Sequence, residues 1–197
     1  MRVALVGSRW FGAQVFGLLL QRGHDVAVVG LKAGDQLTQA AEAAESPLLV
    51  LDRARLVGPE HLPDDLDVIV AAHAHAFIAA EACAKAKRAA IGYHPSLLPR
   101  HRGIAAVEWT IRCRDSIAGG SVYHLTDGLD GGPTAAQDWC FVYPDDDANS
   151  LWRRALGPVG LRLLGQVIDF IAEHGYAEAR EEDPRAATSA PALKAGA

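Results

Sequence analysis

Cysteine is scarce in this chain of 197 residues, and its pattern excludes two kinds of site. The three cysteines, Cys83, Cys113 and Cys140, are odd in number and widely spaced, with no CxxC pair. This pattern is neither a disulfide framework nor a thiolate zinc site. A reducing cytoplasm is therefore the expected location.

Targeting and membrane-spanning segments are also lacking. The start, MRVALVG, is a short apolar run without the basic residues, long apolar stretch and cleavage site of a secretory signal. The uninterrupted apolar runs are too short to span a bilayer, so we expect no membrane partner. The net charge of −5 argues against a nucleic-acid partner, because that binding depends on neutralising phosphates.

The remaining composition is that of a globular protein, with 50% apolar and 22% charged residues. Apolar strands alternate with helical segments, which predicts a doubly wound α/β fold around a mostly parallel sheet. We expect a single domain over residues 1–176 and a docked or frayed tail over 177–197. The expected strands are 2–7, 24–30, 47–51, 67–72, 89–93, 120–125 and 136–143, and the expected helices are 14–22, 35–44, 79–86, 104–113 and 151–174.

Two motifs carry the chemistry. The run GYHPSLLPRHRG covers Gly92–Gly103 and places His94 at a strand end, and SVYHLTDGLDGGP covers Ser121–Pro133 and places Asp130 in a glycine-rich loop. A histidine can carry a proton near neutral pH, and a neighbouring carboxylate can hold its tautomer. The alternative is a histidine satisfied by the backbone and an aspartate that only forms a turn.

Both motifs resemble the 10-formyltetrahydrofolate-dependent formyltransferase family, in which a histidine precedes SLLP and an aspartate lies in a later LDxG loop. The resemblance implies a Rossmann-like formyltransferase fold, with His94 and Asp130 as the catalytic pair. It is strongest with the hydrolase domains of 10-formyltetrahydrofolate dehydrogenases, which share the YHPSLLPRHRG and DGLD strings. The implied reaction removes the formyl group of 10-formyltetrahydrofolate, to water or to an acceptor, and gives tetrahydrofolate. The resemblance places the folate against His73, His75, Ser96, Leu97, Leu98, Pro99, Asp127, Gly128 and Leu129.

One catalytic residue of most of the family is absent. An asparagine usually stands two residues before the histidine, and this chain has Gly92 there. Positions two apart on a strand share a face, so Gly92 leaves a gap beside His94. Loss of one oxyanion donor typically costs about 10²–10³ in rate. Three interpretations follow: His94 acts alone with lower activity, another donor fills the gap, or only a folate-binding shell remains.

The segment GSRWFG, which follows the first strand, is a weaker candidate site. It is not GxGxxG, and no acidic residue follows about 20 positions later at a strand end, so a dinucleotide site is not indicated. Its simplest explanation is close packing of strand and helix. If it binds a substrate, Ser8 and Arg9 contact a phosphate of the acceptor at the helix start, and Gly92 lines the same substrate site.

His73 and His75 follow a strand at the edge where open α/β sheets bind ligands. Either imidazole is a candidate for the donor that Gly92 lacks. Together with His94 and Asp130 they are also residue types that could ligate zinc. The family uses no metal, and histidines of a polar cleft explain the pattern more simply, so we expect formyl-folate without a metal. We also expect Arg102 to bond loop carbonyls through its guanidinium.

Hydrolysis is favoured slightly over transfer, and two rivals stay open. One is an N-formyltransferase for a small amine, an amino sugar or a carrier arm. The other is a non-catalytic folate-binding or regulatory protein. The sequence leaves the acceptor and the oligomeric state undetermined.

Overall fold

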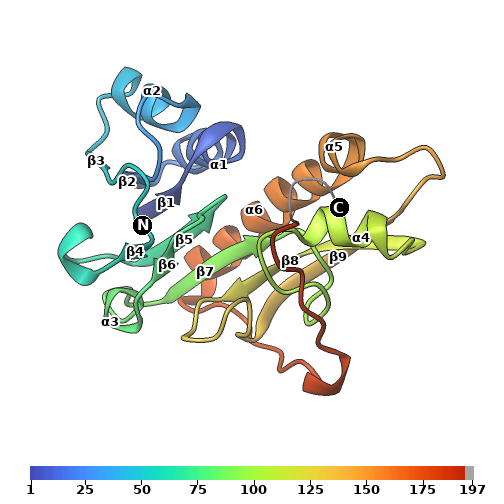
Figure 1. The fold of residues 1–197 in the computed structure, drawn as a ribbon. Helices are drawn as coiled ribbons and strands as arrows, with labels where there is room; N and C mark the ends of the chain where they lie inside the picture. The colour runs from blue at the N-terminus through green and yellow to red at the C-terminus, as the bar shows by residue number, and fades with distance from the viewer. Residues whose placement is uncertain (194–197) are drawn as a thin grey trace. The chain divides into compact units, whose positions relative to one another are not determined.

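The computed structural model describes residues 1–193, and it divides into two compact units (Figure 1). The first comprises Met1–Gly92 and Ile168–Ala177, and the second comprises Tyr93–Val167 and the segment from Glu178 onward. Seven strands form one sheet in the order β3-β2-β1-β5-β7-β8-β9. The strands from β3 to β7 are parallel, and β8 and β9 are antiparallel. The predicted doubly wound, mostly parallel α/β fold is confirmed.

The first unit is built on parallel strands with buried apolar residues. Its strands are β1 (Arg2–Gly7), β2 (Asp25–Gly30), β3 (Leu48–Val50) and β5 (Val68–Ala72), and its helices are α1 (Arg9–Gln21), α2 (Gln36–Ala43) and α3 (Ala80–Cys83). Val3–Val6 of β1 are fully buried. Parallel strands covered on both faces are apolar throughout, which is why the sequence showed no alternation here.

At the end of β1, the backbone passes very close to the backbone of β5. A Cβ on Gly7 would clash with the carbonyl oxygen of Ala72 at the end of β5, so only glycine fits there. Helix α1 then begins at Arg9, five residues before the predicted start, because Ser8 adopts the extended conformation of an N-cap. Three short elements of the first unit lie outside the predicted ones: the parallel pair β4 (Leu56–Val57) and β6 (Phe77–Ile78), and the turn η1 (Pro59–His61).

The second unit begins near the end of β7 (Ala89–His94). It continues through α4 (Ala106–Arg112), β8 (Ile117–His124) and β9 (Thr134–Phe141). One core cluster packs α4 and β8 against the following helices, through Val107, Ala118, Leu151, Ala155 and Leu156. The site described below lies within this unit.

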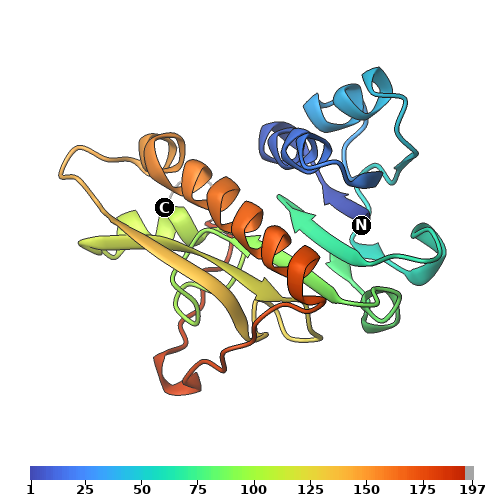
Figure 2. The ribbon, with the colours of Figure 1, turned by 180° about the vertical axis from the view of Figure 1, so that it is seen from behind.

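A continuous helical run follows β9 and is visible as the long helix of Figure 2. It consists of α5 (Ala148–Leu151), the turn η2 (Trp152–Leu156) and α6 (Gly157–His174). Asp147 caps the start of α5, and its side chain accepts a hydrogen bond from the Ser150 amide at 2.7 Å. By length and composition the 27-residue run could cross a membrane, unlike the short uninterrupted runs seen in the sequence. In the structure 56% of its most apolar window is buried, a property that core helices share.

The segment expected to be a tail packs within the second unit as far as residue 193. Thr134 and Arg180 exchange two backbone hydrogen bonds, and the Ala190 amide donates to the Arg102 carbonyl. The turn η3 (Pro184–Ala186) lies between these contacts, and Ala190 is fully buried. The last four residues of the predicted tail lie outside the described residues.

Candidate functional site

His94 is the last residue of β7, and its ring is almost completely buried. The chain turns away after it, so the ring lies against the loop that follows the strand. Its Nε2 atom is 2.8 Å from the carbonyl oxygen of His101. A carbonyl only accepts hydrogen bonds, so Nε2 carries the hydrogen and donates.

Asp130 lies in the loop between β8 and β9 and faces the same ring. Its Oδ2 atom is 3.5 Å from Nδ1 of His94 and accepts a hydrogen bond from the Gly103 amide at 2.8 Å. Its Oδ1 atom accepts from the Tyr123 hydroxyl at 2.7 Å. Two donors therefore orient the carboxylate, and a left-handed backbone (φ 46°) places it. The structure brings the two predicted catalytic residues together.

These contacts assign different tasks to the two ring nitrogens of His94. Because Nε2 donates to a carbonyl, the neutral ring has its lone pair on Nδ1, which faces Asp130. The doubly protonated ring presents an N–H at the same place. Nδ1 is thus the nitrogen that gains and loses a proton.

His101 is itself held by a second carboxylate. Its Nε2 lies 2.6 Å from Oδ2 of Asp115, and its amide donates to the Thr188 hydroxyl at 2.8 Å. Arg100 contacts both oxygens of Asp115 at 3.1 Å. Contacts of both its side chain and its backbone thus hold His101 in a left-handed conformation (φ 53°), and its carbonyl accepts the hydrogen bond from His94. Asp115 was not among the predicted site residues, since it is 14 residues away from His101 in the chain.

The predicted folate-contact residues Ser96–Pro99 form a turn with a cis bond between Leu98 and Pro99. Ser121 donates to the Ser96 carbonyl at 2.6 Å and accepts from the Leu98 amide at 3.0 Å. Gln137 donates to the Leu98 carbonyl at 2.9 Å. Polar groups of the protein thus engage both Leu98 backbone groups. Sequence reasoning missed Ser121 and Gln137, whose only signal is that they are polar positions on two strands.

The remaining residues of this loop region have mixed environments. Asp127, Gly128 and Leu129 are exposed, and Leu129 is the most exposed large apolar residue, at 68%. Their contact with folate stays a prediction. The Nε atom of Arg102 is buried without a hydrogen-bond partner among residues 1–193, so the predicted bond to a loop carbonyl is not made by this atom.

Ser8, Arg9, His73 and His75 lie in the first unit. The Ser8 hydroxyl donates to the His73 carbonyl at 2.9 Å and lies 3.0 Å from its Nδ1, and Nε2 of His73 is 3.3 Å from Nε2 of His75. Burial, with help from the charges of His75 and Arg9, lowers the pKa of His73 to about 4. Burial and then Arg9 also lower the pKa of His75. Both rings are therefore neutral at pH 7.

Gly92 lies within β7 and pairs with Ala71 of β5. It has no side chain, so the family asparagine has no counterpart in this position. Its place in a substrate site, like those of Ser8 and Arg9, stays a prediction. Over residues 1–193, the structure contains no group of three or more His, Cys, Asp or Glu that could hold a metal ion.

Comparison with known proteins assigns the chain. Residues 1–167 match the family described as formyl transferase. Mouse mitochondrial 10-formyltetrahydrofolate dehydrogenase is 36% identical over 187 residues, which are 88% of this chain and 20% of that protein. The chain spans about a fifth of the length of this relative and of similar ones.

Two solved structures share the fold. Phosphoribosylglycinamide formyltransferase from Bacillus halodurans has a TM-score of 0.75 and 21% identity, with 89% of this chain and 97% of that one covered. The N-formyltransferase from Helicobacter canadensis, solved with folinic acid and dTDP-3-aminofucose, has a TM-score of 0.81 and 15% identity, with 96% and 70% covered. With the family match, these findings establish that the chain belongs to the formyl transferase family of folate-dependent enzymes.

Proposed function

We propose that this protein removes the formyl group of 10-formyltetrahydrofolate and transfers it to water. The observation that carries the proposal is the buried pair of His94 and Asp130, with Nδ1 of His94 free of any carbonyl partner. The 36% identity to a 10-formyltetrahydrofolate dehydrogenase supports the choice of donor.

The reaction requires two proton transfers, one from the attacking water to the protein and one from the protein to the folate nitrogen. Water adds to the formyl carbon, and its proton passes to the Asp130–His94 pair. The tetrahedral oxyanion forms beside Nδ1–H of His94, which stabilises it. The C–N bond then breaks, and the folate nitrogen takes a proton from His94, leaving tetrahydrofolate and formic acid, which loses its proton to solvent as formate.

The absence of a side chain at Gly92 affects the expected rate of the proposed reaction. Most of the family resembled here carries an asparagine amide at this position, and in this chain that donor is missing. His94 then both stabilises the oxyanion and transfers the proton. We expect an enzyme that is slower than one with both donors, by about 10²–10³.

The test is the absorbance change as purified protein converts 10-formyltetrahydrofolate to tetrahydrofolate without an added acceptor. We expect turnover, and a loss of about 10²–10⁴ in kcat for His94→Ala and for Asp130→Ala. Circular dichroism verifies that each variant is folded. Folate binding without turnover in the natural protein contradicts the proposal and supports a non-catalytic binding protein.

A second candidate is N-formyl transfer to an amine. It is favoured by the fold shared with an N-formyltransferase solved with folinic acid and an amino-sugar nucleotide. Turnover that is negligible alone and rises at least about tenfold with an added amine identifies this reaction instead. Small amines and amino-sugar nucleotides are the acceptors to supply.

A further inference from the structure

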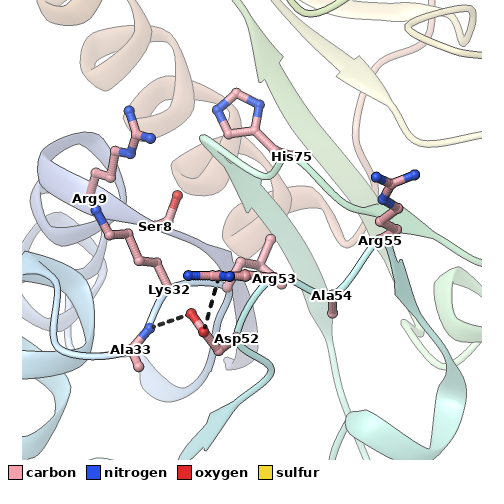
Figure 3. A pocket seen from close by; sticks show the side chains of 10 residues that line it. Ser8, Arg9, Lys32, Ala33, Asp52, Arg53, Ala54, Arg55 and His75 are labelled. Carbon is pink, nitrogen blue, oxygen red and sulfur yellow. Dashed lines mark hydrogen bonds and ion pairs between the residues drawn. The ribbon is translucent and has the colours of Figure 1, made fainter.

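A basic pocket of about 520 Å³ lies in the first unit, at the carboxyl ends of β1, β2 and β3 (Figure 3). This volume is within the range of small-molecule sites. Four cationic side chains line it: Arg9, Lys32, Arg53 and Arg55. Asp52 is its single carboxylate. Figure 3 shows Arg9 and Lys32 on one side and Arg55 on the other, with Asp52 and Arg53 between them.

Three of the four cations are not neutralised by the protein. Asp52 accepts from the Ala33 amide at 3.2 Å and lies 3.7 Å from Nε of Arg53, so that pair balances itself. Arg9, Lys32 and Arg55 form no ion pair with any residue of the described chain, 1–193. The pocket therefore has a net charge of about +3 in a chain whose net charge is −5. Such a concentration of one sign favours an anionic ligand.

The first amide of α1 is already engaged within the protein. The Arg9 amide, the first of the helix, already donates to the carboxylate of Asp35. Asp35 is buried and also accepts from the amides of Leu37 and Thr38, at 3.1 Å each. The Ser8 hydroxyl is engaged by His73. An anion in this pocket is therefore held mainly by the long cationic side chains that line it.

The rest of the lining is uncharged. Leu31, Ala33 and Ala54 contribute apolar groups. His75 is neutral, and its Nε2 points to Nε2 of His73. Nδ1 of His73 donates to Ser8, so Nε2 of His73 is the acceptor and Nε2 of His75 the donor. Nδ1 of His75 then has a lone pair that can accept from a ligand hydroxyl.

We propose that this pocket binds a ligand with a diphosphate group joined to an uncharged, hydroxyl-bearing organic part, as in a nucleoside diphosphate. A diphosphate supplies two to three negative charges over several ångströms, which matches three unpaired cations on opposite sides of the pocket. A single phosphate is more compact and carries less charge. The site is independent of the proposed formyl chemistry, because its evidence is in the first unit alone.

Isothermal titration calorimetry of the full chain tests the site with four probes: ADP, pyrophosphate, inorganic phosphate and adenosine. We expect ADP to bind most tightly, pyrophosphate next, phosphate at least about tenfold more weakly than pyrophosphate, and adenosine not measurably. Binding weakens as salt is added, because exposed charges are screened.

The variant Lys32→Ala/Arg55→Ala weakens ADP binding at least about tenfold. The control Lys87→Ala/Arg185→Ala removes the same charge from exposed positions outside the pocket and leaves ADP affinity within about twofold. Equal weakening by both variants means general attraction to a charged surface and overturns the site. So does the absence of ADP binding at about 10 mM in low salt.

Discussion

The carbonyl of His101 determines which nitrogen of His94 carries the proton, and Asp115 holds His101 in place. Asp115→Asn keeps the size of the side chain but removes its charge. We expect kcat to fall about tenfold with little change in KM, because the imidazole tautomer is less well fixed while folate contacts persist. The measurement is the pH profile of kcat, whose midpoint shifts if the tautomer is disturbed.

Asp146→Asn is the matched control for that variant. Asp146 is also a partly buried carboxylate of the second unit, and it is paired with Arg154 instead of His101. It is expected to lower stability and leave the pH profile unchanged. A profile that moves equally in both variants assigns Asp115 a structural role only.

The Tyr123 hydroxyl supplies one of the two hydrogen bonds to Asp130. Tyr123→Phe removes the donor and keeps the ring, which packs edge-on to His94 at 6.4 Å between centroids. We expect kcat to fall about three- to tenfold, the effect of about 1 kcal/mol for one hydrogen bond. Unchanged kcat would show that Gly103 alone orients the carboxylate.

Among single residues, the catalytic pair could be predicted from the sequence, but the side chains that hold it in place could not. His94 and Asp130 were identified through their motifs, and the structure places them 3.5 Å apart. Asp115, Ser121, Gln137 and Thr188 were missed, because each acts through a contact with a residue remote in the chain. Ordinary polar residues carry no local signal of such a contact.

At the level of elements, glycines of β8 allow side chains of the second unit to pack against the strand. A Cβ on Gly120 would lie 2.6–2.7 Å from ring carbons of Tyr93, whose hydroxyl donates to the Leu156 carbonyl at 2.6 Å. Gly120→Ala therefore forces a pinned ring to move. We expect a loss of about 1–3 kcal/mol in the free energy of unfolding, measured with urea.

Gly17→Ala is the control for this variant. Gly17 lies inside α1, and a Cβ there meets no atom within 4 Å. Alanine is the better helix former, so the same change should stabilise the protein by about 0.5–1 kcal/mol. A loss of stability in both variants would refute the packing argument.

Elements with uninterrupted apolar runs were predicted well, and the two-residue strands were missed. Strands β1, β2 and β5 lie within a residue or two of their predicted bounds, because their apolar runs are uninterrupted. The two-residue strands β4 and β6 have no pattern to recognise. Helix α1 begins early because the backbone conformation of Ser8, and not an apolar period, determines its start.

For the whole molecule, His73 makes stability depend on pH. Its pKa is about 4 in the folded protein and near 6.5 when unfolded, since burial disfavours the charged ring. Between these values the unfolded state binds the proton first, so stability falls as the pH drops from 6.5 towards 4. We expect a contribution of about 1–2 kcal/mol to the loss between pH 7 and pH 5.

Urea unfolding at both pH values measures this loss. His73→Asn removes the titrating group, and asparagine tolerates the left-handed backbone (φ 55°) of this position. The variant should lose less stability on acidification than the natural protein. An equal loss in both proteins would show that other groups cause it.

The two compact units are both discontinuous in the sequence, and this has a consequence for synthesis on the ribosome. The first unit needs residues 168–177, and the second needs the segment that begins at Glu178. Neither unit has all its residues when its first stretch has left the exit tunnel, so we expect both cores to close only after nearly all of these residues have emerged. We therefore expect a nascent chain to expose apolar strands for most of its translation time, and to be protected by ribosome-associated chaperones more than a protein with contiguous domains is.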